Sequence, residues 1–218
     1  MKDALFSLLL ILITGISLKA YGQAEDFEGR SRNSGGTEYL FGPNTSWGGW
    51  GGPFVEIGST DNQFSVFTGG GGGVLFNRSL FIGGFGQDLS NDIEYELPVG
   101  ERVNTDARLN LDMGMGGMWV GYSFPARKAV HLTAMTKFGW GDATLYYVRN
   151  NRNDNSDVYA QDDFFMIAPQ GGLEANLAPW FRISLEGGYR FISGANLPVV
   201  ETLDGAYGTM TLRFGWFQ

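Results

Sequence analysis

Few side chains in this sequence have types and spacing that suit catalysis. His131 is the only histidine, so any histidine-based acid–base or nucleophilic chemistry must use it. It follows a short turn at 125–128, and the sequence around it supplies no marked nucleophile. We therefore expect His131 to be a structural residue that is hydrogen-bonded inside the protein.

Two further motifs invite a ligand-binding interpretation. The run Gly69 to Gly73 could cradle a phosphate, but no lysine follows it in the P-loop pattern, and close packing of strands is the better interpretation. Asp154, Asn155 and Asp157 could hold calcium, but the EF-hand glycine and distal glutamate are missing, which indicates a solvated acidic loop. Asp162-Asp163 resembles a loop boundary. We expect no catalytic, cofactor or metal site, and we predict that the protein is not an enzyme.

The composition limits the class of protein. The chain has 218 residues, 34 glycines, 15% aromatic and 17% charged residues, and no cysteine. Glycine and aromatic residues favour sheet, and the absence of cysteine excludes disulfides and thiolate metal sites. The net charge of −8 argues against a nucleic-acid partner, because phosphate binding needs a basic face. We expect one all-β folded unit.

The first residues have the pattern of a secretory signal peptide. Lys2 precedes an apolar run from Ala4 to Ile16, and the small-x-small triplet Ala20-Tyr21-Gly22 follows. We predict a signal peptide at 1–22 that is cleaved after Gly22, a mature N-terminal extension at 23–47, and a β-barrel at 48–218. The alternative is an uncleaved N-terminal anchor helix, for which the run is short.

Alternation of apolar and polar residues predicts the strands. From Phe181 the odd positions are apolar and the even ones polar, and the segments that follow Val130, Phe165 and Thr209 alternate in the same way. We place strands near 51–59, 63–76, 80–88, 107–124, 129–148, 162–177, 180–192 and 206–217. Within 107–124 the apolar phase moves from odd to even positions, which predicts a bulge near Gly116-Gly117.

The connections separate a membrane barrel from a soluble β-sandwich. Asn77-Arg78-Ser79, 125–128 and Ala178-Pro179 are tight turns, whereas 89–106, 149–161 and 193–205 are long and polar. Alternating short and long connections are typical of an outer-membrane barrel with both termini in the periplasm. We therefore predict an eight-stranded antiparallel transmembrane β-barrel with an up-and-down meander.

The strand phases also predict a charged lumen. An eight-stranded barrel is only wide enough to be filled by side chains, so we expect the inward charges to pair and close the pore. The predicted inward cations and anions are Lys137, Arg182, Arg190, Arg213, Glu56, Asp112, Glu174 and Glu186.

The chain resembles the small OmpA/OmpX-type outer-membrane barrels of Gram-negative bacteria. Its last strand carries Phe214, Trp216 and Phe217, which are similar to the C-terminal insertion signal of such barrels, although Gln218 is the last residue. The segments Trp47 to Pro53 and Phe81 to Gly84 resemble a glycine-rich, uncharacterised set of surface barrels. The resemblance implies contacts with outer-membrane lipid, lipopolysaccharide and the barrel-assembly machinery. Barrels with lipase, acyltransferase or protease activity carry their catalytic groups toward the outer face, which His131 does not match.

These observations favour a non-enzymatic outer-membrane protein. Its barrel would act as a membrane anchor, and its external loops and N-terminal segment would make the contacts of an accessory or structural surface protein. The sequence leaves open whether this is a subunit of a surface complex, an adhesin-like module or an envelope-stabilising component. The alternatives are a narrow channel for small or hydrophobic solutes and, third, a membrane-embedded lipid hydrolase.

Overall fold

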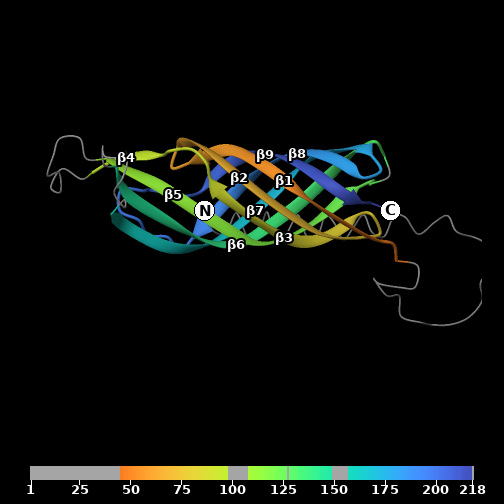
Figure 1. Ribbon diagram of the computed structural model, residues 1–218, viewed down its shortest axis with the longest axis horizontal. Helices are drawn as coiled ribbons and strands as arrows, with labels where there is room; N and C mark the ends of the chain where they lie inside the picture. Colours follow the sequence, from red (N-terminus) through yellow and green to blue (C-terminus); the bar gives the residue numbers. More distant parts are fainter. Residues whose placement is uncertain (1–44, 98–107, 127, 149–156, 218) are drawn as a thin grey trace, which may run out of the picture. The chain divides into compact units, whose positions relative to one another are not determined.

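A computed structural model describes residues 45–97, 108–126, 128–148 and 157–217, which form a closed antiparallel β-barrel (Figure 1). With one exception, strands that follow one another in the chain are paired, and the first strand pairs with the last. The strands are β1 (Trp47–Thr60), β2 (Gln63–Phe76), β3 (Leu80–Leu89), β4 (Glu94–Glu96), β5 (Arg108–Phe124), β6 (Val130–Val148), β7 (Val158–Ala178), β8 (Phe181–Ser193) and β9 (Gly205–Trp216). In the described part of the chain, no helix is long and apolar enough to cross a membrane.

The predicted eight-stranded meander is confirmed, with one short strand added. β3 and β4 both pair with β5, β3 along 114–122 and β4 along 108–110. They therefore lie one after the other along the same edge of β5 and together take the place of one strand, so the barrel has eight strands around its circumference. β4 lies at the left-hand end of the barrel in Figure 1.

Short turns cluster at one end, which we call the short-turn end, and the opposite end is called the long-loop end. Asn77 and Arg78 have φ of 49° and 63° between β2 and β3, the left-handed pair that a two-residue hairpin turn requires. The long-loop end has one exception to the predicted alternation, because Asp61 and Asn62 (φ 51° and 60°) form the same kind of turn between β1 and β2.

A band of apolar side chains surrounds the barrel near the short-turn end. On β8, Leu185 is 61% exposed while Arg182 and Glu186 are buried, so the predicted facing of this strand is correct. On β6 the outward apolar positions run from Val130 to Trp140. Ten residue steps of about 3.3 Å at a tilt of about 40° span about 25 Å, the height of the apolar band of an outer-membrane barrel.

Beyond this band, toward the long-loop end, the inner surface of the barrel becomes apolar and the outer surface becomes polar. Leu109, Leu111 and Met113 on β5 are buried inside the barrel, and Asp112 faces outward and is exposed. We call this part of the wall the collar. The predicted bulge near Gly116-Gly117 is wrong, because β5 pairs with β3 and β6 there without a register shift. The apolar residues change faces because the medium outside changes from lipid to water.

Inward glycines make room for large rings. A Cβ on Gly71 would lie 2.5 Å from Trp119 Cη2, and one on Gly83 would lie 2.5 Å from Trp119 Nε1. Trp119 is 1% exposed and fills the lumen across these two strands. The glycine run of β2 therefore serves side-chain packing inside the barrel.

Candidate functional site

The lumen holds seven of the eight charged residues predicted to face inward. Glu56, Lys137, Glu174, Arg182, Glu186, Arg190 and Arg213 are all nine-tenths or more buried. The prediction for Asp112 was wrong, because odd positions of β5 face inward along its whole length. Among the described residues predicted to face inward, the lumen thus contains four lysine or arginine side chains and three carboxylates rather than equal numbers.

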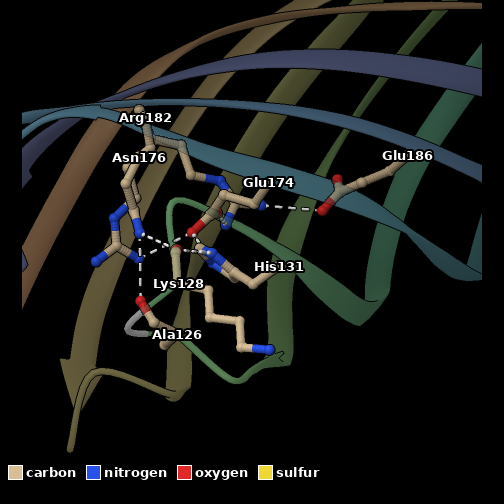
Figure 2. Close-up of polar contacts among 8 residues, drawn as sticks. Ala126, Lys128, His131, Glu174, Asn176, Arg182 and Glu186 are labelled. Carbon is tan, nitrogen blue, oxygen red and sulfur yellow. Dashed lines mark hydrogen bonds and ion pairs between the residues drawn. The ribbon is translucent and has the colours of Figure 1, made fainter.

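Glu174 is the centre of the first ion-pair cluster, near the short-turn end. Its Oε1 accepts a hydrogen bond from Arg182 Nη1 at 2.8 Å and lies 2.9 Å from His131 Nε2. Its Oε2 pairs with Arg213, whose Nη2 also lies 3.1 Å from Glu186 Oε1. Figure 2 shows the side chains of His131 and Arg182 directed at Glu174. One carboxylate therefore holds three basic groups from three strands.

His131 links this cluster to the turn between β5 and β6. Its Nδ1 lies 3.1 Å from the backbone oxygen of Lys128. Asn176 Nδ2 donates to the same oxygen at 2.7 Å and to Ala126 O at 3.3 Å (Figure 2). Both ring nitrogens of His131 are engaged, so neither is available to activate a nucleophile.

Glu56 is the centre of the second cluster. It accepts from Lys137 Nζ at 3.0 Å and from Arg190 Nη1 at 2.7 Å. Lys137 also donates to Gln87 Oε1, and Arg190 to Thr60 Oγ1. This cluster ties β1 to β6 and β8 across the lumen, which fits a filled pore.

Aromatic rings occupy the space between the charged groups. Trp119 stacks on Trp50 and Phe85 at centroid distances of 5.1 and 5.7 Å. The Arg213 guanidinium lies 4.6 Å from the Trp50 ring, and Lys137 Nζ lies 4.5 Å from that of Phe54. The sequence analysis missed these rings, although Trp50 and Phe54 stand at the even spacing of inward residues on β1.

An apolar lid closes the long-loop end. Leu197 and Leu203 of the 193–205 connection are buried, as are Ile93 and Leu97 before and after β4. The 193–205 connection is long and most of its residues are exposed or half-buried, as its sequence indicates, but the sequence analysis did not predict that its leucines fold over the lumen. Burial of Tyr95 beneath the lid raises the pKa of its phenol, and the nearby Asp61 carboxylate raises it further.

Carboxylates dominate the outer surface of the collar. Asp88, Gly114, Asp142 and Asp163 are register partners across β3, β5, β6 and β7, so three acids lie in one row. Asp112 and Asp92 lie beside the row, and both line a cavity of about 500 Å³ with Asn110. The described residues contain no group of three or more side chains that could hold a metal ion.

The C-terminal residues lie on both surfaces of the barrel. Phe214 and Trp216 face outward, and Trp216 is 65% exposed. Phe217 is buried, and the Arg182 guanidinium carbon lies 3.8 Å from its ring centre. The predicted loop boundary at Asp162-Asp163 is wrong, because both residues lie inside β7. Asp162 accepts hydrogen bonds from the backbone nitrogens of Asp163 and Asn196. The predicted signal peptide, nearly all of the N-terminal extension, Asp154 and Asn155 lie outside the described residues.

Comparison with known proteins supports the fold. No protein-family model and no curated protein matches the chain by sequence. Neisserial surface protein A matches in structure with a TM-score of 0.50 at 12% identity, over 78% of this chain and 98% of that one. Ail, the attachment invasion locus protein of Yersinia pestis, solved with the heparin analogue sucrose octasulfate, matches at 0.43 and 17% identity over 78% and 96%. A major outer membrane protein from Thermus thermophilus matches at 0.43 and 9% identity, over 76% and 99%.

The chain therefore has the fold of the small OmpA/OmpX-like outer-membrane β-barrels. Its apolar band and its closed sheet are the features that this fold requires in a bilayer.

Proposed function

We propose that this protein is a non-enzymatic outer-membrane anchor that presents its acidic collar and long-loop end to a partner outside the cell. Both termini lie on the periplasmic side in this proposal, and the barrel contacts outer-membrane lipid and lipopolysaccharide after insertion by the assembly machinery. The observation that carries the proposal is the reversal of polarity between the apolar band and the collar. A wall that continues beyond the bilayer with a dry interior and an acidic exterior is a rigid platform for contacts in water.

The charge of the platform indicates the chemistry of the partner. Among the described residues, the long-loop end has one exposed cation, Arg108, since Arg190 is buried in the lumen. The acidic residues there are Asp61, Asp88, Asp92, Glu94, Glu96, Asp112, Asp142, Asp157, Asp162, Asp163, Glu201 and Asp204. Complementary charge steers and selects partners, so a protein with a basic surface fits this face.

The channel alternative needs a continuous water path through the barrel. The two ion-pair clusters, the stacked rings between them and the apolar lid all occupy the lumen. A lipid hydrolase needs a free general base, and both nitrogens of His131 are engaged. Both alternatives therefore have less support than the anchor.

The test is cross-linking in native outer membranes with a carbodiimide, which joins carboxylates directly to lysines. We expect one stoichiometric partner whose lysines couple to collar residues such as Asp142 and Asp163. The coupling should weaken at high salt and in an Asp142→Asn, Asp163→Asn double variant. Coupling that maps only to the short-turn end, or none at all, would remove support for the proposal.

A further inference from the structure

Two arginines, Arg78 and Arg182, lie at the short-turn end of the barrel, opposite the acidic collar. A cavity of about 440 Å³ opens there, lined by Arg78, Arg182, Asn176, Phe217 and residues of two neighbouring turns. Arg78 comes from the β2–β3 turn and is half-buried, and the Arg182 side chain is 6% exposed. None of the seven lining residues is acidic.

The carboxylates deeper in the lumen are already paired, one of them with Arg182 itself. Glu174 pairs with Arg182, Arg213 and His131, and Glu186 pairs with Arg213. In this cluster two arginines, Arg182 and Arg213, balance two carboxylates, Glu174 and Glu186, and Arg78 at the mouth is an additional cation. A half-buried guanidinium group beyond this balance, such as that of Arg78, attracts an anion.

Asn176 adds an acceptor to this cavity. Its amide nitrogen donates to Ala126 O and Lys128 O, which fixes the orientation of the amide. Its Oδ1 is buried and has no hydrogen-bond partner in the described structure. A ligand that fits must therefore offer anionic oxygens to the arginines and one hydroxyl to Asn176.

We propose that this cavity binds a phosphate group. Phosphate oxygens match the forked donors of arginine, and a P–O–H or a headgroup hydroxyl can donate to Asn176 Oδ1. Phe217 supplies an apolar wall against which the Arg182 plane already stacks. The phosphate can belong to inorganic phosphate or to a glycerophospholipid of the adjacent leaflet, and the chemistry is the same in both cases.

The test uses the full mature chain refolded in nanodiscs. One arm adds inorganic phosphate to phosphatidylcholine discs, with chloride at equal ionic strength as the reference, and follows the thermal unfolding midpoint. The second arm compares phosphatidylcholine discs with discs that contain phosphatidylglycerol. We expect a saturable rise of the midpoint in at least one arm.

Arg78→Gln should weaken this apparent affinity by about tenfold or more. Arg108→Gln removes the same charge at the opposite end and should leave the affinity unchanged, since Arg108 pairs with Glu94 on the surface. Ala178→Glu, which places a carboxylate in the cavity wall, should abolish the effect even if Arg78→Gln folds poorly.

The two arms separate the sources of phosphate. A rise with inorganic phosphate identifies a free anion, and a rise only with phosphatidylglycerol identifies a lipid headgroup. The proposal is overturned if neither arm shows a rise, or if Arg78→Gln and Arg108→Gln behave alike in both. Neither result bears on the partner of the collar at the other end.

Discussion

Trp140 and Asp142 lie two residues apart on the outward face of β6, and the surface changes from apolar to acidic between them. On the inward face the change runs the other way, from Lys137 to Ala143 and Leu145. A single strand thus carries two opposite patterns in succession, each matched to the medium outside. This boundary defines where hydrocarbon ends on the barrel and leads to the first prediction.

Leu185→Arg should destabilise the refolded barrel by about 2–4 kcal/mol, because it places a charge on the lipid face near the middle of the band. Gln161→Arg, at an exposed outward position of the collar, should cost about 0–1 kcal/mol. Denaturant titrations in lipid vesicles measure both. Equal costs would show that the band does not end near Trp140.

Glu174→Gln should cost about 3–5 kcal/mol, because it leaves Arg182 and His131 buried without their carboxylate and weakens the pairing of Arg213. The matched control is Glu94→Gln in the exposed pair with Arg108, which should cost about 0–1 kcal/mol. The same titrations apply. A mild effect at Glu174 would mean that water reaches the lumen and screens the cluster.

Gly71→Ala should destabilise the barrel by about 1–3 kcal/mol, because the added methyl would lie 2.5 Å from both Trp119 Cη2 and Gly84 O. Gly86→Ala on β3 is the control, since a Cβ there meets nothing within 4 Å. On detergent gels the folded and the heat-unfolded barrel migrate differently, and the temperature at which the folded band disappears compares the stability of the two variants. If both behave as the unsubstituted protein does, Trp119 is not seated on the glycines as described.

Purified protein should show no stable single-channel conductance in planar bilayers and no solute uptake in liposomes. The ion-pair clusters and the lid occupy the lumen of the described barrel, so we expect no continuous path for ions between its two ends. A long-lived open state of the unsubstituted protein would instead favour the channel alternative.

The sequence was most informative where lipid faces the barrel. Leu185 and Arg182 alternate in the band, and period two alone assigned their faces correctly. It failed for Asp112, because the assignment assumed lipid outside every strand along its full length. The burial of Leu197 and of Trp119 was also not predicted. Leu197 is buried because its loop folds back over the barrel, and Trp119 fits inside because glycines on other strands leave it room, and both depend on contacts between distant segments of the chain.

The row of Asp88, Asp142 and Asp163 fixes how deeply the barrel can be immersed. Moving the barrel inward by two residues would bring these carboxylates into hydrocarbon, and moving it outward would bring Val130 and Leu132 into water. Each displacement has its own opposing free energy, so the barrel has a restoring force along the membrane normal. A pull on the collar by a bound partner would therefore be transmitted to the bilayer as local deformation rather than as slippage of the protein.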